Sequence, residues 1–373
     1  MDQPPRGSSS IPSLWCPLPS RIHPQRASIT EFQLEWSVRH RLAVGRDEIA
    51  RLARTDIAGL AARFVPRATL TGAQTLAILL TATFVIDDLN DDGRLRGRPD
   101  DFAHYASALS RALGPGPLAE PADPPVRALH DIGRRLTHVA SPALAARIVR
   151  DFRATLAAEV RESTNNARRL PPDLDTYVQN RLATTWVLPL TDLAAAVDGV
   201  EPALADLDRP EVRALTEMTS LILGFDNDIC GYAKDRRDGA VDVNNLPDVL
   251  ARATGAGPAQ ALAQAVSLRD QVLAHWLRLY DRLGETAGPA PAGHLANLAS
   301  MISGHLHWAA ACPRHTIPHG GPVIRISPAR RACDAPAADR LDVPSIAWWR
   351  DLPGTPRAAD DGAAPSQRRL EAP

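Results

Sequence analysis

Patterns that favour helices follow one another through most of this chain, and this succession constrains the fold more than any other feature. Ala, Leu and Arg dominate, which are strong helix formers, and the apolar–polar alternation typical of β-strands is nearly absent. Helices are predicted over residues 31–44, 47–61, 71–89, 100–113, 124–139, 141–169, 174–185, 186–197, 211–234, 244–253, 258–283 and 292–311. So many helices with short loops between them predict a single large all-α bundle.

The two ends of the chain differ from this helical region. Residues 1–13 are rich in Pro, Gly and Ser and show no periodicity. We therefore expect a flexible N-terminal tail over 1–14, one α-helical domain over 15–318, and a Pro/Ala/Arg-rich C-terminal tail over 319–373 that is disordered. A Trp-Trp pair at 348–349 interrupts this C-terminal tail and could dock on the bundle.

The composition excludes several classes of protein. With 42 Lys+Arg against 43 Asp+Glu, the chain lacks the positive excess of a nucleic-acid-binding protein. Its four cysteines form no CxxC pair, which argues against a structural zinc site and a disulfide framework. The longest apolar run, near 77–86, is about half the ~20 residues that a membrane span needs, and the N-terminus lacks a signal-peptide pattern. We expect a cytoplasmic protein without nucleic-acid or membrane partners.

A run of carboxylates closes the most apolar of the predicted helices, 71–89. The sequence over 84–92 reads Phe-Val-Ile-Asp-Asp-Leu-Asn-Asp-Asp. Asp87 and Asp91 are four residues apart, so on a helix they share a face, where like charges repel by a few tenths of a kcal/mol. A cation between them removes that repulsion, and Mg²⁺ prefers oxygen ligands, usually one or two carboxylates together with substrate phosphates. The alternative interpretation is a polar helix end followed by a turn.

A second polar cluster closes the predicted helix 211–234. Asn227, Gly231 and Asp235 are spaced i, i+4 and i+8 and lie on one face, where amide and carboxylate oxygens suit Mg²⁺. Lys234, the only lysine of the chain, adjoins Asp235 and could bind a phosphate held by the metal. A solvated helix end is the alternative. Acidic groups at two helix C-termini both meet the unfavourable end of a helix dipole, and this coincidence indicates metal binding at one mouth of the bundle.

With these two clusters the chain resembles the bacterial class I terpene cyclases, over roughly Trp15–Ile317. Residues 87–91 resemble the aspartate-rich motif of that family, and residues 227–235 resemble its second metal motif, usually Asn-Asp-x-x-Ser-x-x-x-Glu. Two positions depart from the pattern. Gly231 replaces the usual Ser or Thr, so one side-chain ligand is missing, and Asp235 replaces Glu and is one methylene shorter.

Three further segments carry the resemblance. The segment ending at Arg181 resembles the helix with the family's diphosphate-sensing Arg, and the family's helix break falls just after it. The segment from Trp308 resembles a C-terminal motif ending in Arg-Tyr, with Arg314 kept and His315 in place of Tyr. Residues 15–24 resemble the N-terminal segment that folds over the active site.

The resemblance implies metal-assisted ionisation of a linear prenyl diphosphate, followed by cyclisation of the carbocation. The residues that would hold Mg²⁺, as three ions bound with the diphosphate, are Asp87, Asp88, Asp91, Asn227 and Asp235. The residues that would bind the diphosphate oxygens are Arg181, Lys234, Arg314 and His315; the two arginines would be catalytic. The aromatic faces that would stabilise the cation, in a site that excludes water, are those of Phe84 and Trp308, with Phe64 and Trp186 as further candidates.

The substrate that we expect is farnesyl diphosphate, which would give a sesquiterpene, while C10 and C20 substrates stay open, as does a homodimer. One alternative is a chain-elongating prenyltransferase of the same fold. Such an enzyme needs a second Asp-rich motif, whereas the second motif here begins Asn-Asp. The other alternative is a helical binding protein that has lost catalysis, which Gly231 and His315 would favour.

Overall fold

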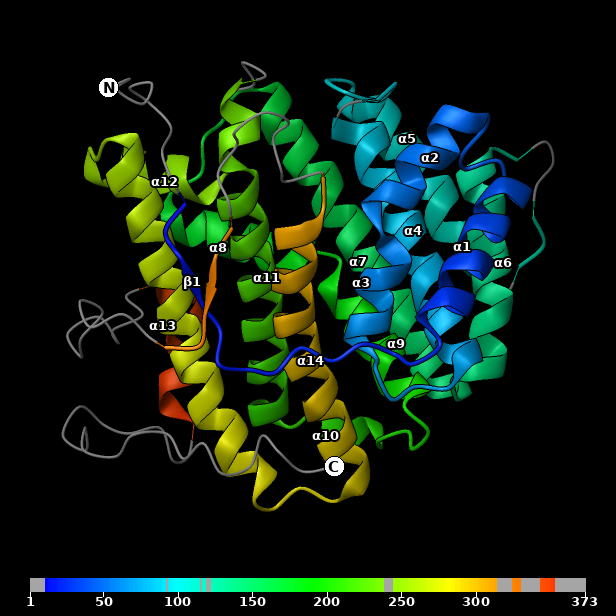
Figure 1. Ribbon diagram of the computed structural model, residues 1–373. Helices are drawn as coiled ribbons and strands as arrows, with labels where there is room; N and C mark the ends of the chain where they lie inside the picture. The colour runs from blue at the N-terminus through cyan, green and yellow to red at the C-terminus, as the bar shows by residue number, and fades with distance from the viewer. Residues whose placement is uncertain are drawn as a thin grey trace, which may run out of the picture.

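The chain folds into one bundle of roughly upright helices (Figure 1). The computed structural model describes residues 11–91, 93–114, 116–118, 122–237, 244–313, 324–329 and 343–352, and over 233–237 it describes the backbone alone. The α-helices are α1 (Arg26–Arg39), α2 (Arg46–Thr55), α3 (Ile57–Phe64), α4 (Leu70–Asp91), α5 (Pro99–Ala112), α6 (Pro124–Val139), α7 (Pro142–Ala167), α8 (Leu174–Thr184), α9 (Val187–Val197), α10 (Leu204–Leu207), α11 (Pro210–Arg237), α12 (Leu246–Thr254), α13 (Pro258–Gly284) and α14 (Pro289–Ala311). The predicted all-α class is confirmed.

Helix α4 forms the centre of the N-terminal half of the bundle. It packs against α1, α3, α6 and α9, and Leu76, Ile78 and Leu79 are fully buried. By length and composition this helix could cross a membrane, but 67% of its most apolar stretch is buried inside the bundle. That burial is typical of the core helix of a globular protein, which is apolar nearly all round.

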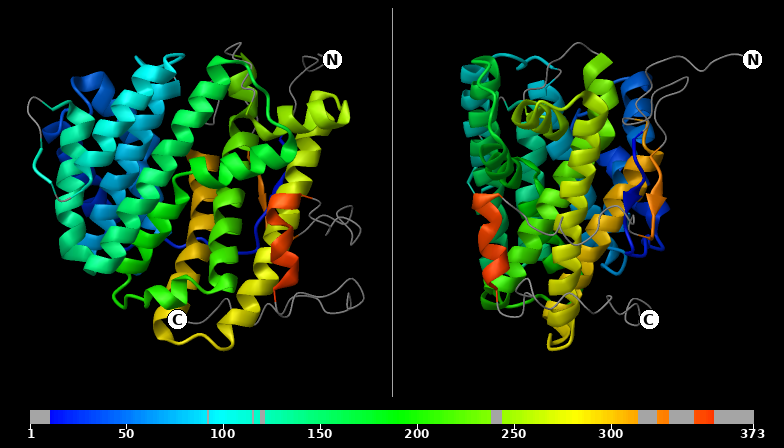
Figure 2. Two further views of the ribbon diagram at one scale, coloured as in Figure 1. Left: turned by 180° about the vertical axis from the view of Figure 1, so that it is seen from behind. Right: turned by 90° about the vertical axis from the view of Figure 1, so that its left-hand side faces the viewer.

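Helix α11 has the corresponding central position in the second half. It packs against α8, α9, α13 and α14. Figure 1 shows the blue and cyan N-terminal helices on the right and α8, α11, α12 and α13 on the left, and the view from behind in Figure 2 shows the same two groups. Helix α9 packs against both α4 and α11 and so joins the two halves.

Two residues in the left-handed conformation divide regions of helical sequence. The sequence predicts one helix over 47–61, and this prediction is wrong because Asp56, at φ 53°, ends α2 and begins α3. Its carboxylate accepts a hydrogen bond from the Gly59 backbone N–H at 3.2 Å and caps α3. The break expected between 174–185 and 186–197 is confirmed, and there Trp186, at φ 59°, begins α9.

Parts of the C-terminal tail pack on the bundle. Strand β1 (Leu14–Trp15) pairs in parallel with β2 (Ile326–Ser327), and the 3₁₀ helix η2 (Pro344–Asp351) lies against α8. Trp349 is fully buried, and its indole N–H donates to Glu217 at 3.1 Å. The sequence predicted little regular structure over 319–373; the structure differs because Trp349 gains a buried site with a hydrogen-bond partner.

The N-terminal segment after β1 runs along the side of the bundle. It crosses from β1 on the left of Figure 1 to α1 on the right. The Pro19 carbonyl oxygen accepts from Ser303 on α14 at 3.0 Å, and the Ser20 hydroxyl accepts from Arg63 on α3 at 3.2 Å. These contacts attach the segment to α3 and α14.

Candidate active site

The two acidic motifs lie on helices that finish at the same end of the bundle. Helix α4 ends at Asp91, inside the first motif, and α11 passes through the second motif and ends at Arg237. In Figure 1 both helices rise to the upper end of the bundle. Side chains from α7, α8 and the α8–α9 junction connect them.

Arg181 is held against α11 by partly buried hydrogen bonds. Its Nη2 donates to Asp228 Oδ1 at 2.6 Å and to the Gly224 carbonyl oxygen at 3.1 Å. Asp228 is 7% exposed and also accepts from the Tyr177 hydroxyl at 2.5 Å and the Leu246 backbone N–H at 2.9 Å. Burial, and then the charge of Asp228, raises the pKa of Tyr177 well above its usual range, so the phenol stays a donor at neutral pH. Arg181 is therefore fixed against the helix of the second motif.

Gly224 makes room for this arginine. A Cβ atom at this position would lie 2.9 Å from Arg181 Nε and 2.9 Å from Thr185 Cγ2. Only glycine allows α8 and Thr185, the residue that caps its C-terminal end, to approach α11 this closely. Sequence reasoning missed Gly224, since one glycine in an apolar helix carries no distinctive signal.

The α8–α9 junction contacts both motifs. Thr185 shares a hydrogen bond of 2.5 Å with Ser220 on α11. On its other side, the Trp186 indole N–H donates to Asp87 Oδ1 on α4 at 2.7 Å. Together with Arg181, four residues before Thr185, these contacts bring the first motif and the second motif to one junction.

Glu159 on α7 adds a carboxylate that the sequence did not single out. Burial, followed by the carboxylates of Asp87, Glu162 and Asp91, raises the pKa of Glu159 well above its usual range, while Arg181 opposes the shift. Like-charged carboxylates gathered in a partly buried place favour a bound cation, and carboxylate oxygens are the ligands of hard divalent metals. The chemistry of these carboxylates suits a divalent metal, although no three of them gather into a metal site among the residues that the structure describes.

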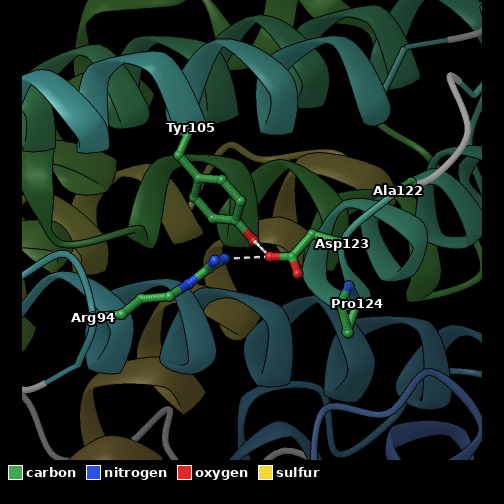
Figure 3. Close-up of a pocket in the computed structure, with 5 residues that line it drawn as sticks. All are labelled: Arg94, Tyr105, Ala122, Asp123 and Pro124. Carbon is green, nitrogen blue, oxygen red and sulfur yellow. Dashed lines mark hydrogen bonds and ion pairs between the residues drawn. The ribbon is translucent and has the colours of Figure 1, made fainter.

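Contacts of Arg94 with Asp123 and Tyr105 hold the start of the loop that follows the first motif (Figure 3). Arg94 forms an ion pair with Asp123, next to the start of α6, and the Tyr105 hydroxyl on α5 donates to Asp123 at 2.7 Å. The Arg94 guanidinium also lies 5.0 Å from the centroid of the Tyr105 ring. Burial, and then the hydrogen bond to Asp123, raises the pKa of Tyr105. These contacts connect the end of α4 to α5 and α6.

The structure places some of the other predicted ligands and leaves others outside its description. Asp88 is half-buried, and Asp91 and Asn227 are exposed. Lys234 and Asp235 belong to α11, but their side chains lie outside the described residues. Arg314 and His315 also lie outside the described residues.

The structure brings two of the predicted aromatic residues together. Phe84 on α4 and Trp308 on α14 meet edge to face, with ring centroids 5.8 Å apart. The Trp308 indole N–H donates to the Thr55 carbonyl oxygen at 2.8 Å, which fixes the ring. Trp186 packs on Phe152, and Phe64 is buried in α3.

A buried ion cluster lies beside the second motif. Arg269 on α13 and Asp226 are fully buried and paired at 2.8 Å, and Arg269 also binds Asp270 at 3.0 Å. Although burial alone would raise it, Arg269 holds the pKa of Asp226 below its usual value. Arg269 also donates to the Trp15 carbonyl oxygen. The cluster connects β1 to the residue before Asn227, and no local pattern indicated it because Arg269 is 43 residues from Asp226 and 254 residues from Trp15.

Comparison with known proteins agrees with this fold and with metal binding. A family model described as terpene synthase family 2, C-terminal metal binding, matches residues 79–275. Bonnadiene synthase of Allokutzneria albata is 32% identical over 357 residues, which cover 91% of this chain and 97% of the relative. The (+)-T-muurolol synthase ((2E,6E)-farnesyl diphosphate cyclizing) of Streptomyces clavuligerus is 30% identical, over 96% of this chain and 86% of the relative.

Solved structures are similar over most of the chain. The SVS_A2 protein from ancestral sequence reconstruction has a TM-score of 0.77 and 30% identity, over 91% of this chain and 98% of that one. Cucumene synthase has a TM-score of 0.68 and 26% identity, over 79% of this chain and 98% of that one. The fold and the matched metal-binding family thus define an α-helical enzyme that uses a divalent metal. The chain belongs to the bacterial class I terpene synthases, which are lyases that act on prenyl diphosphates.

Proposed function

We propose that this terpene cyclase converts farnesyl diphosphate into a cyclic sesquiterpene with the help of Mg²⁺. The observation that carries the proposal is the α8–α9 junction, where Arg181 is bound to the second motif and Trp186 to the first. A farnesyl diphosphate cyclase among the relatives supports the substrate. A relative named as a diterpene cyclase, 26% identical, makes a C20 diphosphate the second candidate.

Two sets of residues in this chain would promote ionisation, one by binding metal and the other by binding the diphosphate. Asp87, Asp88, Asp91, Asn227 and Asp235 would hold Mg²⁺, as three ions bound with the diphosphate. These ions would neutralise the diphosphate and so make it a leaving group. Arg181, Lys234, Arg314 and His315 would bind its oxygens, and a planar guanidinium suits such oxygens bidentately. Charged donors fixed before the reaction stabilise charge that develops during it.

The cyclisation step depends on the apolar part of the site. Phe84 and Trp308 would present aromatic faces to the carbocation, each worth on the order of 0.5–2 kcal/mol when desolvated. The face of an aromatic ring stabilises a cation without attacking it as a nucleophile. Water has to be excluded, since it would capture the cation as an alcohol.

The test is incubation of the full chain with C10, C15 and C20 prenyl diphosphates and Mg²⁺, with products identified by mass spectrometry. We expect a cyclic C15 hydrocarbon and release of diphosphate that stops when EDTA is added. Asp87→Asn and Asn227→Ala should each lose most turnover and keep the wild-type circular dichroism spectrum. Asp100→Asn, on an exposed carboxylate of α5, is the matched control.

Other outcomes identify the alternatives. Condensation with a C5 diphosphate to a longer linear product would indicate a chain-elongating prenyltransferase. No turnover with any prenyl diphosphate would indicate a binding protein that has lost catalysis.

Light scattering after size-exclusion chromatography decides between a monomer and a homodimer. We propose a cytoplasmic protein without nucleic-acid or membrane partners.

A further inference from the structure

Trp186 has a backbone conformation that is unusual for a large side chain. Its φ is 59° and its ψ is 2°, in the left-handed region that bulky residues avoid. Among the described residues, the other non-glycine positions with positive φ are occupied by Arg41, Asp56 and Arg169. Trp186 alone among these four is buried, at 4% exposure. A buried tryptophan in a strained conformation needs contacts that hold it there.

Those contacts fix the indole on two sides. The ring packs on Phe152 of α7, with centroids 5.1 Å apart and planes inclined by 52°. The indole N–H donates to Asp87 Oδ1 at 2.7 Å, the short distance typical of a bond to a charged acceptor. An indole nitrogen donates and never accepts, so Asp87 is the acceptor in this contact.

The acceptor is the first carboxylate of the acidic motif. Asp87 lies near the carboxylates of Asp91 and Glu159, and the like charge of Asp91 would repel an unsupported carboxylate. One donated hydrogen bond restrains Asp87 against this repulsion. A carboxylate has about four acceptor positions on two oxygens, and the hydrogen bond to the indole uses one of them.

We propose that Trp186 is a positioning residue that holds Asp87 ready for a divalent cation. It acts through Asp87 and does not itself bind the metal or the substrate diphosphate. The left-handed conformation at the start of α9 is what places the indole next to α4. This inference rests on the proposed role of Asp87 as a metal ligand. Hydrogen bonds to a ligating carboxylate typically change metal affinity by about 10–100-fold.

The test is Trp186→Phe, which keeps an aromatic ring at the junction and removes the N–H. One readout is the Mg²⁺ concentration that gives half-maximal turnover. The second needs no turnover: calorimetric titration of Mg²⁺ into the protein with inorganic diphosphate. We expect Mg²⁺ binding about 10-fold weaker in both measurements. Trp186→Gly, which accepts the left-handed conformation, repeats the test if the Phe variant fails to fold.

Trp36→Phe is the matched control. Its indole N–H donates to Asp131 at 2.8 Å, it is 1% exposed, and it connects α1 to α6. This control should leave Mg²⁺ binding unchanged. Mg²⁺ affinity of Trp186→Phe within twofold of wild type, or an equal loss in Trp36→Phe, would overturn the positioning role. An active Asp87→Asn variant would instead remove the metal assignment on which the inference rests.

Discussion

At the scale of single residues, Arg181 fits next to the second motif because Gly224 leaves space for it. Arg181 was predicted from the resemblance to the family. Gly224 and Asp228 become meaningful only when α8 and α11 are packed together, since Gly224 supplies space and a carbonyl oxygen and Asp228 supplies a counter-charge. One feature of the sequence could have indicated Asp228, because this residue directly follows Asn227 in the second motif.

Gly224→Ala should therefore impair turnover. A Cβ atom 2.9 Å from Arg181 Nε forces the guanidinium or α8 to move. Because displacement of a charged group by about 1 Å can cost about 100-fold in rate, we expect a loss of that order. Helix propensity favours Ala by up to ~1 kcal/mol, which offsets part of the strain in stability. Steady-state kinetics and a melting curve on the same preparation separate the two effects.

Gly284→Ala is the control for this substitution. Gly284 ends α13 and has open space where a Cβ would lie. This variant should keep wild-type turnover. Unchanged turnover in Gly224→Ala would show that Arg181 does not need its present position.

At the scale of elements, the contacts between helices decide which side chains meet. The α8–α9 junction joins the two motifs, and α7 supplies Glu159 and Phe152. Packing also buries His294, in the second turn of α14, near Arg147 of α7. The sequence pattern predicted helices α7, α8, α9 and α14 but not these pairings, because a helix period reports which face is buried and not what covers it.

The burial of His294 predicts a pH dependence of stability. Burial, and then the charge of Arg147, lowers the pKa of His294 from 6.5 to about 4. Between these values the unfolded chain binds a proton that the folded chain does not, so stability falls as the pH falls through this window. At most about 3 kcal/mol is involved, at 1.36 kcal/mol per pKa unit. Urea unfolding of wild type and His294→Gln at pH 7 and pH 4.5 should show a smaller difference for the variant.

His104→Gln, at an exposed position of α5, is the control for this series. It should lose as much stability on acidification as wild type. If His294→Gln does the same, the histidine is not the source of the pH dependence.

At the scale of the whole molecule, segments from both ends of the chain are fastened to the bundle. The first strand is held by Arg269 and by pairing with β2, and η2 lies on α8, the helix that carries Arg181. The Ser345 backbone N–H donates to Asp175 at 2.8 Å near the start of α8. The sequence placed a Trp-Trp pair in this tail but could not say where it docks.

Trp349→Ala should loosen this attachment. The side chain is fully buried and donates to Glu217, and truncation of a buried Trp typically costs about 3–5 kcal/mol. We expect a lower melting temperature and faster proteolytic cleavage near residue 343. Trp348→Ala is the comparison, because Trp348 is half-buried with Arg213 5.5 Å from its ring centroid. An equal response of the two variants would contradict docking through Trp349.

The sequence by itself determined the properties that depend on local spacing. Helix periodicity and breakers predicted the all-α bundle and the break after Arg181, and i, i+4 spacing placed the carboxylates of each motif on one helix face. Tertiary structure alone decided that Trp186 meets Asp87, that Glu159 joins the acidic groups, and that Gly224 makes room for Arg181. These contacts join residues from 43 to 99 positions apart in the chain. No local pattern encodes them, because they arise only when helices with separately determined faces are packed around one core.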